Sequence, residues 1–430
     1  MKTNLFKYIA VAGGLFIANV MFNSCSNEEL ISIDKIYIHS LDDTTTELSK
    51  VRLGQMIRIQ GSGFSTTKAI YCNGVEISGV NTNYITDDCI ILKIPSDLPT
   101  GSDVEDENVR NTIRIVTEYD EFVYKFDILA ASPTITSVSH TLPRAGEWID
   151  IYGTSFKDIE YVTFPGGVNS TEFSVNEDYT ILSVKVPEGI GENYGELTVY
   201  GANGGAYSYS DFNFKSGQFI WQFNNDSGDK AFNYGSNNSA NLTDVIPTEG
   251  NGAKSPDCYR AIPGEPATTP KEGEIGGFNF YADKAIQIVL DANSGNGAIT
   301  EKTKCSELAF QCDMYINIET WTTAALRLDL NGNRNTLTPW LQNASVVAYA
   351  FENGWKTMTW AIKDIPTYAN MTLGDLKSAL TGKNARIIWL NGQFQDASGN
   401  WFSGTEMKDA QIYLGNFRLV PYTKKNYVND

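Results

Sequence analysis

Two stretches of this chain decide its fold: Leu53-Gly-Gln-Met-Ile-Arg-Ile-Gln-Gly-Ser-Gly-Phe64 and Ala145-Gly-Glu-Trp-Ile-Asp-Ile-Tyr-Gly-Thr-Ser-Phe156. Each residue of the second stretch lies 92 positions after its counterpart in the first, and the same offset pairs Ile94-Pro95 with Val186-Pro187. An offset that stays constant over several landmarks, without a gap, indicates tandem domains of one fold.

Each copy is predicted to be a small β-sandwich. Ile57 and Ile59 alternate with polar residues, as do Ile149 and Ile151, which is the pattern of half-buried strands. The glycine before each phenylalanine suits a turn with positive φ. No long segment with a period of 3.6 residues occurs in this half, so strands and turns are expected here.

The second copy fits the longer pattern Pro133-x-Ile135…Gly146-x-x-Ile149-x-Ile151-x-Gly153-x-x-Phe156…Val162-x-Phe164-x-Gly166. This pattern resembles the IPT/TIG immunoglobulin-like family. The resemblance implies two tandem immunoglobulin-like sandwiches, residues 25–130 and 131–216. Since neither range shows clustered acids or a nucleophile beside a base, we expect both to be spacers.

The N-terminus has the form of a secretory signal. Two lysines precede an apolar stretch, Tyr8–Phe22, which is too short and too rich in glycine to span a membrane stably. Cys25 follows a small residue, which resembles a bacterial lipobox and implies a signal peptide over 1–24. The acidic pair Glu28-Glu29 resembles the signal that sends Bacteroidetes lipoproteins to the cell surface. We therefore expect a lipid anchor at Cys25 in the cell outer membrane, facing outward; an incidental cysteine behind a plain signal peptide is the alternative.

Composition limits the classes of function. The chain has 430 residues and a formal net charge of −18, a surface that repels polyphosphate, so nucleic acid is not an expected partner. It has only two histidines, His39 and His140, which gives poor support to a histidine-rich metal site or a Ser-His-Asp triad. We predict no catalytic residue, no metal and no cofactor, and a monomer.

Five cysteines follow Cys25, and none forms a CxxC motif. An odd number in an exported protein leaves at least one thiol unpaired within the chain. Buried thiols are expected for most of them, with Cys72–Cys89 as the best candidate for a disulfide. The five are Cys72, Cys89, Cys258, Cys305 and Cys312.

Composition changes near Gly217, and seven of the eight tryptophans lie beyond it. We predict a third, larger β-sandwich over 217–430. Three of its expected strands, 308–316, 324–331 and 386–394, alternate apolar residues with Gln, Asp, Asn, Arg, Tyr and Trp. Planar amides, Arg and outward-facing aromatic rings suit a sugar, which has apolar C–H patches and a ring of hydroxyls.

Three landmarks narrow this prediction: Thr338-Pro-Trp340, Asn353-Gly-Trp355 to Ile362, and Ile412 to Val420. Together they resemble the C-terminal domain of Bacteroidetes surface glycan-binding proteins of the SGBP-B type. The resemblance implies an aromatic platform at Trp340, and packing roles for Trp355 and Trp360. Gly415 stands where such domains usually have Asp, which puts a structural cation in doubt.

The predicted function is non-catalytic capture of a polysaccharide, which an outer-membrane glycan transporter then takes up. A β-glucan such as xyloglucan, mixed-linkage glucan or laminarin is expected. The predicted glycan-binding residues comprise a platform, a loop tryptophan and polar side chains: Trp321, Trp340, Trp389, Trp401, Arg327, Asp329, Asn331, Asn391 and Gln393.

Two other functions stay open. A glycoside hydrolase or lyase on a β-sandwich would need two carboxylates across a cleft, and Asp313 and Asp329 are the candidates for such a pair. A surface adhesin that binds a protein would also fit the repeated sandwiches.

Overall fold

The computed structural model describes thirteen ranges: 30–220, 242–243, 259–263, 273–295, 297–316, 320–322, 324–342, 345–346, 349–350, 354–391, 394–395, 401–402 and 411–427. The predicted signal peptide, Cys25, Cys258 and Gln393 lie outside the described residues. The chain divides into two compact units, Met1–Pro99 with Val104–Ile128 and Thr100–Asp103 with Leu129–Asp430. The predicted boundaries at 130 and 216 stay predictions.

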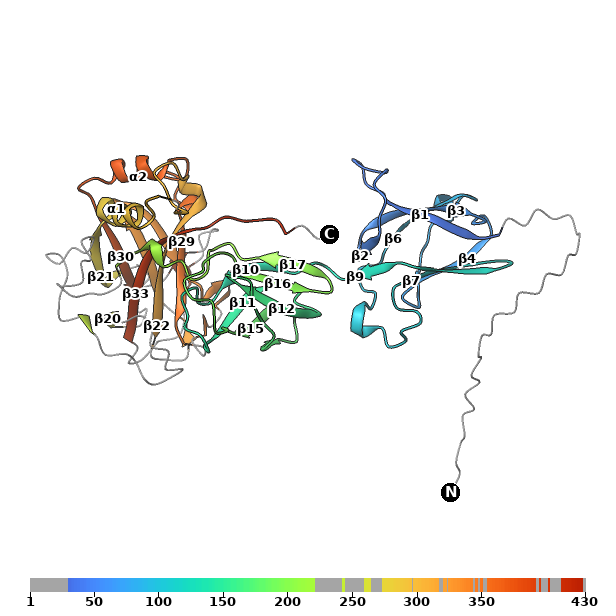
Figure 1. The fold of residues 1–430 in the computed structure, drawn as a ribbon, viewed down its shortest axis with the longest axis horizontal. Coiled ribbons are helices and arrows are strands. Elements are labelled where there is room, and N and C mark those ends of the chain that lie inside the picture. Colours follow the sequence, from blue (N-terminus) through green and yellow to red (C-terminus); the bar gives the residue numbers. More distant parts are fainter. Residues whose placement is uncertain are drawn as a thin grey trace, which may run out of the picture. The chain divides into compact units, whose positions relative to one another are not determined.

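The first unit is a β-sandwich (Figure 1). A three-stranded sheet of order β1-β3-β6 packs its isoleucines against those of a four-stranded sheet of order β5-β4-β7-β8, and β2 pairs with β9. The strands are β1 Ser32–Ile38, β2 Lys50–Arg52, β3 Met56–Ser62, β4 Thr67–Cys72, β5 Val75–Glu76, β6 Cys89–Lys93, β7 Thr112–Thr117, β8 Glu121–Lys125 and β9 Asp127–Leu129.

The second copy of the repeat forms a second sandwich, here called sandwich 2. Its two sheets have the orders β10-β11-β15-β14 and β13-β12-β16-β17 and enclose one apolar core. The strands are β10 Thr134–Val138, β11 Trp148–Thr154, β12 Ile159–Phe164, β13 Val168–Ser170, β14 Phe173–Val175, β15 Ile181–Lys185, β16 Thr198–Gly201 and β17 Gly204–Tyr207.

The repeated glycines Gly61 and Gly153 have a common cause. A Cβ on Gly61 would overlap the carbonyl oxygen of Ser32 and lie 2.6 Å from the ring of Phe64. A Cβ on Gly153 would overlap the carbonyl oxygen of Thr134 in the same way. Glycine is therefore needed in both copies for the close approach of neighbouring backbone, and not for positive φ.

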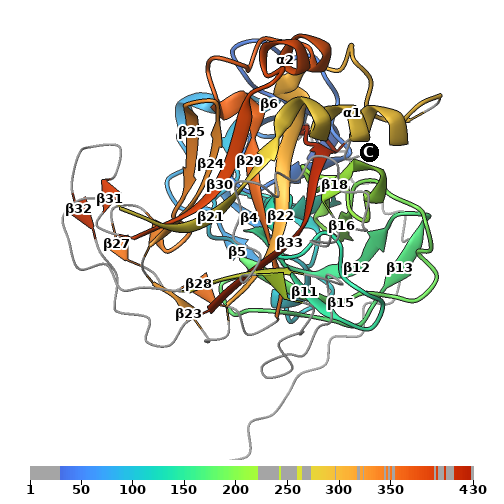
Figure 2. The ribbon, with the colours of Figure 1, turned by 90° about the vertical axis from the view of Figure 1, so that its left-hand side faces the viewer.

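The C-terminal domain consists of two stacked sheets around a large apolar core (Figure 2). One sheet has the order β19-β20-β33-β22-β29, with β18 also paired to β33, and the other has the order β21-β30-β24-β25. The main strands are β18 Gln218–Ile220, β19 Leu242–Thr243, β20 Tyr259–Pro263, β21 Gly273–Tyr281, β22 Leu308–Ile316, β24 Ala325–Leu330, β25 Asn333–Leu337, β29 Lys356–Ala361, β30 Asn384–Asn391 and β33 Gln411–Pro421.

Short hairpins complete the described part of this domain. They pair β23 with β28, β26 with β27, and β31 with β32. Their strands are β23 Thr320–Trp321, β26 Leu341–Gln342, β27 Ser345–Val346, β28 Tyr349–Ala350, β31 Phe394–Gln395 and β32 Trp401–Phe402.

Two helices that the sequence prediction lacks lie together at one end of the sheets (Figure 1). They are α1 Ala282–Ala292 and α2 Leu373–Ala379. Thr372 caps α2 and exchanges hydrogen bonds with Asp375 in a capping box, a signal that could have predicted it. Apart from these helices and short 3-10 turns, the described secondary structure of the domain consists of strands, so the predicted all-β fold is confirmed.

The predicted disulfide between Cys72 and Cys89 is wrong, because both thiols are free. Cys72 points into the core of the first unit, whereas on β6 it is Ile90 that faces the core and Cys89 that faces away. The prediction of buried thiols is confirmed for Cys72, Cys305 and Cys312. Burial raises the pKa of the Cys72 thiol to about 12, which keeps it protonated and unreactive.

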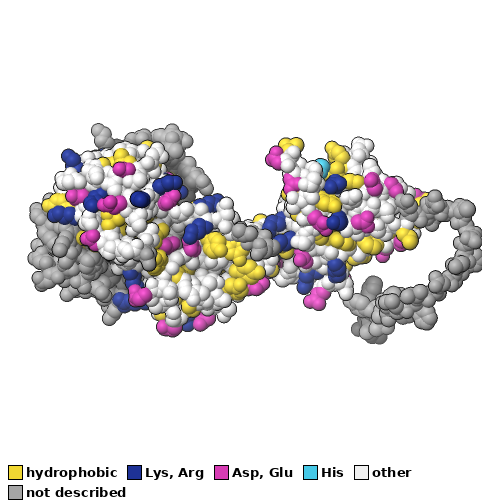
Figure 3. Space-filling model, turned by 45° about the horizontal axis from the view of Figure 1, so that its top comes forward, with side chains coloured by type: hydrophobic (Ala, Val, Ile, Leu, Met, Phe, Trp, Pro, Cys, Tyr) yellow, Lys and Arg dark blue, Asp and Glu magenta, His cyan; other side chains and the backbone are white. Residues whose placement is uncertain are grey.

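Charged side chains of both signs are mixed on the one face of the described surface that Figure 3 shows. No basic patch stands out on that face. A search of the described helices finds none that is long and apolar enough to cross a membrane.

Candidate functional site

The predicted aromatic platform is buried in the core. Trp321 and Trp389 have no exposed surface, and their rings lie 5.2 Å apart. The register explains this, because Trp389 pairs with Leu326 and so shares the inward face of its sheet with Leu326 and Leu328. The prediction of outward-facing aromatic rings is therefore wrong for Trp321 and Trp389.

Trp340 is also fully buried. Its indole Nε1 donates a hydrogen bond of 2.6 Å to the carbonyl oxygen of Ala324, a residue whose φ of 66° is unusual for a side chain with a Cβ. An indole without exposed surface offers no face to a sugar ring. Glycan contact through Trp321, Trp340 and Trp389 stays a prediction. It requires a conformation in which these three rings are exposed.

The outer face of the β21-β30-β24-β25 sheet carries a row of polar side chains, although Ile388 and Leu390 on the same face of β30 are buried. Asn279, Arg386, Asp329 and Arg334 lie opposite one another in a row across its four strands. Arg386 Nε donates to Asn279 Oδ1 at 3.1 Å, and Arg334 Nε donates to Asp329 Oδ2 at 3.2 Å. This row of alternating donors and acceptors, here called the polar row, is the described feature best suited to a ring of hydroxyls.

Arg327 lies two residues before Asp329 on β24, and therefore on the same face as the polar row. Its Nε donates to Thr336 Oγ1 at 2.8 Å, and its side chain is largely buried, as is that of Asp329. Arg327 and Asp329 were predicted from strand parity; Arg386 and Asn279 were missed. The register explains the omission. Ile387 pairs with Leu328 and faces inward, so Arg386 and Ile388 face outward.

The other predicted polar residues are spread over turns and strand ends. Asn331 is exposed in the β24–β25 turn with a φ of 51°. Asn391 ends β30 and Trp401 begins β32, but their side chains are outside what the structure describes. Their contacts with a glycan stay predictions.

The polar face predicted on β22 is not a sugar surface. Gln311, Asp313 and Tyr315 are all buried, and sandwich 2 contacts the first two. Gln311 Nε2 donates to Ser210 Oγ at 3.0 Å, and Thr141 Oγ1 donates to Gln311 Oε1 at 3.2 Å. The alternation of polar residues on this strand therefore marks an interface within the protein.

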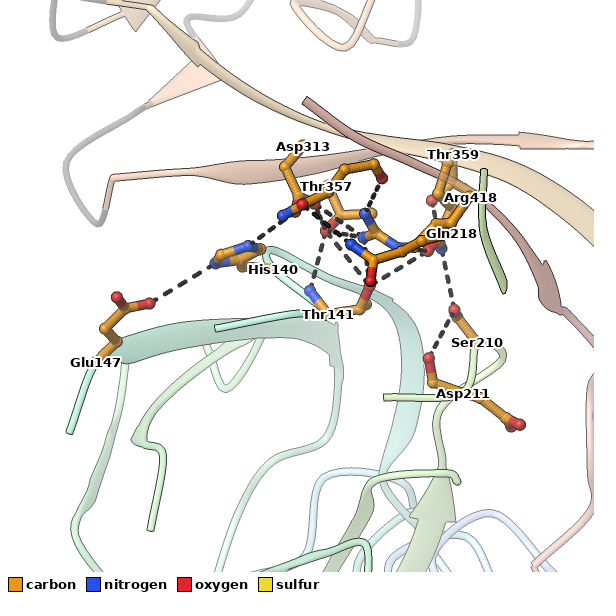
Figure 4. A network of polar contacts seen from close by, with 12 residues as sticks. His140, Thr141, Glu147, Ser210, Asp211, Gln218, Asp313, Thr357, Thr359 and Arg418 are labelled. Atoms are coloured by element: carbon orange, nitrogen blue, oxygen red, sulfur yellow. Dashed lines mark hydrogen bonds and ion pairs between the residues drawn. The ribbon is translucent and has the colours of Figure 1, made fainter. Parts of the chain in front are cut away.

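Asp313 and Arg418 form the centre of that interface (Figure 4). Arg418 Nη2 lies 2.8 Å from Asp313 Oδ1 and donates to Thr141 Oγ1 at 2.9 Å. His140 Nε2 lies 3.4 Å from Asp313 Oδ2. Burial acts to raise the pKa of the Asp313 carboxyl, but Arg418 and His140 outweigh it and hold that pKa well below its ordinary value.

A second buried ion pair crosses the same interface. Lys356 Nζ on β29 lies 3.1 Å from Asp150 Oδ2 on β11, and neither side chain is appreciably exposed. The Ser183 hydroxyl donates to the other oxygen of Asp150 at 2.7 Å. Sandwich 2 and the C-terminal domain are thus joined by buried, hydrogen-bonded ion pairs. Loss of one partner of such a pair would leave the other charge buried and unpaired.

The carboxylate pair proposed for a hydrolase does not form. Asp313 lies on the outer face of its sheet, against sandwich 2, and Asp329 lies on the outer face of the opposite sheet. The whole core separates them, so they cannot flank one glycosidic bond. Among the described residues no group of three or more His, Cys, Asp or Glu could hold a metal ion.

A family model described as the surface glycan-binding protein B xyloglucan binding domain matches residues 212–421. An IPT/TIG domain-containing protein of Bacteroides ovatus is 29% identical over 205 residues, which cover 43% of this chain and 41% of that protein. This chain is SGBP-B-like. The predicted resemblance to SGBP-B proteins, which rests on Thr338–Trp340, Asn353–Ile362 and Ile412–Val420, is confirmed. The match spans only about two fifths of the length of the Bacteroides protein.

The solved structure of surface glycan-binding protein PbSGBP-B from Prevotella bryantii has a similar fold. It superposes with a TM-score of 0.61 at 17% identity, over 91% of this chain and 99% of that one. At this identity the likeness concerns the SGBP-B-like fold alone. The packing roles predicted for Trp355 and Trp360 agree with their burial, at 1% and 0% exposed.

Proposed function

We propose that this chain is a cell-surface protein that captures a polysaccharide and does not cleave it. The observation that carries the proposal is the match of residues 212–421 to a xyloglucan-binding domain. The ligand is a neutral β-glucan, with xyloglucan, mixed-linkage glucan and laminarin as the first candidates. The interspersed surface charges and the net charge of −18 also favour a neutral chain over a polyanion.

The polar row and Arg327 are the proposed glycan-binding surface. Asn279, Arg386 and Asp329 present amide, guanidinium and carboxylate groups in one line, spaced by the strands of a rigid sheet. Strands lie about 4.8 Å apart, so the row spans about 14 Å across the four strands. Asn331, Asn391, Gln393 and Trp401 are proposed to add contacts around it.

The proposed setting is a lipid anchor at Cys25 in the cell outer membrane, with the first unit and sandwich 2 as spacers. The chain would act as a monomer and deliver the glycan to an outer-membrane transporter. The support is the lipobox-like sequence before Cys25 and the similarity to surface glycan-binding proteins.

Affinity electrophoresis of the purified chain tests the proposal. Gels that contain xyloglucan, mixed-linkage glucan or laminarin are expected to retard the protein, and gels that contain polygalacturonate are not. Absence of retardation by every neutral glucan would overturn the proposal. A reducing-sugar assay on the same polysaccharides is expected to show no turnover; turnover would favour the hydrolase instead.

A further inference from the structure

A cavity lies where sandwich 2 meets the C-terminal domain, apart from the polar row. Its volume is about 390 Å³, within the range of sites for small molecules. One wall is β10, an edge strand of sandwich 2, and the other is β29, an edge strand of the C-terminal domain. The two strands are joined near one end, where Thr357 N donates to the carbonyl oxygen of Ser139 at 2.6 Å. We call this cavity the joint cleft.

The joint cleft is lined by aromatic rings and hydroxyl groups. Tyr209, Tyr349 and Tyr422 contribute half-buried rings, and those of Tyr209 and Tyr422 stack with centroids 5.9 Å apart. Hydroxyl groups of Ser137 and Thr359 lie among the lining side chains. Ring faces next to hydroxyls match the two kinds of surface that a sugar presents, its C–H patches and its hydroxyls.

The joint cleft is also neutral. None of the described residues that line it is Asp, Glu, Lys, Arg or His. This is unusual in a chain in which such side chains are common, and the larger cavity nearby, of about 710 Å³, is lined by Arg144, Glu188 and Lys215 among others. A charged ligand in the joint cleft would lose hydration without gaining a counter-ion, so a neutral ligand is favoured.

The walls of the joint cleft are held in place before any ligand arrives. Gln311 Nε2 donates to Ser210 Oγ and to Thr359 Oγ1, both at 3.0 Å. Arg418 in turn holds Gln311 and Thr141, and Figure 4 shows Thr141 and Thr357 beside Arg418. A preformed site costs little to order on binding, which suits a weak, short-chain contact.

We propose that the joint cleft is a second saccharide site, which takes a short neutral segment of the captured glycan. This inference rests on the proposed function, because the segment belongs to the same polysaccharide. Two sites on one rigid body bind a long chain more tightly than either binds a short one. The C-terminal domain would thus bind a long glycan more tightly when sandwich 2 is present than without it.

The test counts ligands bound by the full chain. Equilibrium dialysis with labelled cellotetraose is expected to saturate at about two molecules per chain, one at each site, as independent sites require. Ser137→Trp fills the joint cleft from an exposed position, and Tyr209→Ala removes part of its aromatic wall. Each is expected to halve the saturating ratio. Arg386→Ala, in the polar row, is expected to halve it independently.

Tyr161→Ala is the matched control. Tyr161 is a half-buried tyrosine of sandwich 2 that stacks on Tyr200 at 5.1 Å and does not line the joint cleft. This variant should keep the wild-type ratio. A wild-type ratio of one, or a ratio of two that Ser137→Trp and Tyr209→Ala leave unchanged while circular dichroism shows them folded, overturns the second site. Absence of any cellotetraose or β-glucan binding overturns the proposed function as well.

Discussion

Arg418→Ala is the sharpest test of how the second unit is held together. The guanidinium donates to Asp313 Oδ1, Thr141 Oγ1 and the carbonyl oxygen of Asn416, at 2.7 to 2.9 Å. The alanine variant leaves the Asp313 carboxylate, which is 0% exposed, without the Arg418 guanidinium. Two hydrogen-bond donors remain to it, Thr357 Oγ1 at 2.9 Å and Asn416 Nδ2 at 2.8 Å, and His140 Nε2 lies 3.4 Å away.

Breaking one partner of a buried ion pair typically costs about 3–5 kcal/mol, because an uncompensated charge remains. In a unit of this size each kcal/mol lowers the melting temperature by about 2 °C, so a decrease of roughly 6–10 °C is expected at pH 7. Differential scanning calorimetry of the purified chain measures it. The first unit does not contain Arg418, so its transition should not move.

The pH dependence gives an independent check. Since the pKa of Asp313 is lowered in the folded protein, its pairing contributes stability above the unfolded pKa of about 3.9. That contribution is lost as the pH falls through the folded pKa. The difference in melting temperature between wild type and Arg418→Ala should therefore be full at pH 7 and shrink below about pH 4.

Lys185→Ala serves as the control, since Lys185 pairs with Glu172 at 2.9 Å on the surface, where such pairs contribute about 0–1 kcal/mol. The double variant Asp313→Leu/Arg418→Met removes both charges and should recover most of the lost stability. If Arg418→Ala lowers the melting temperature no more than Lys185→Ala does at pH 7, the interface is not stabilised as we argue.

Three further predictions follow from the described residues and the sequence. Trp389→Ala should destabilise the C-terminal domain by about 3–5 kcal/mol, measured by calorimetry, because Trp389 is fully buried. An unchanged melting temperature together with lost glycan binding would show instead that Trp389 contacts the glycan. Arg386→Ala should weaken retardation in xyloglucan gels several-fold while Lys185→Ala does not. Cys25→Ala should move the protein from the membrane to the soluble fraction on ultracentrifugation, and continued membrane association would refute the lipid anchor.

The two sandwiches were predictable because their signal is local and repeated. Ile57 and Ile59 on β3, and Ile149 and Ile151 on β11, are fully buried at the positions that alternation predicts. Because the pattern occurs twice, the second copy gives independent support for each predicted strand. What the repeat could not supply was the reason for Gly61 and its counterpart, which is close approach of a neighbouring strand and therefore a tertiary property.

The strands of the C-terminal domain were also predictable, but which face of each strand points inward was not. Parity places Ile388 and Trp389 on opposite faces, and apolar character alone favours Ile388 as the inward residue. The pairing of Trp389 with Leu326 reverses this choice. Register between strands distant in sequence is fixed by the packed core, so a single strand's pattern leaves the choice open.

The β22 strand shows the deeper reason why a sugar surface and a protein interface are hard to tell apart. Both need side chains that pair in fixed geometry away from bulk water, so both select Gln, Asp and Arg over the Lys and Glu of a solvated face. The distinction lies in the partner. For Gln311 and Asp313 the partners are already in the chain, as Thr141, Ser210 and His140 of sandwich 2. The polar row on the opposite sheet has the same chemistry, and the partner that we propose for it is a glycan, on the basis of the match over residues 212–421.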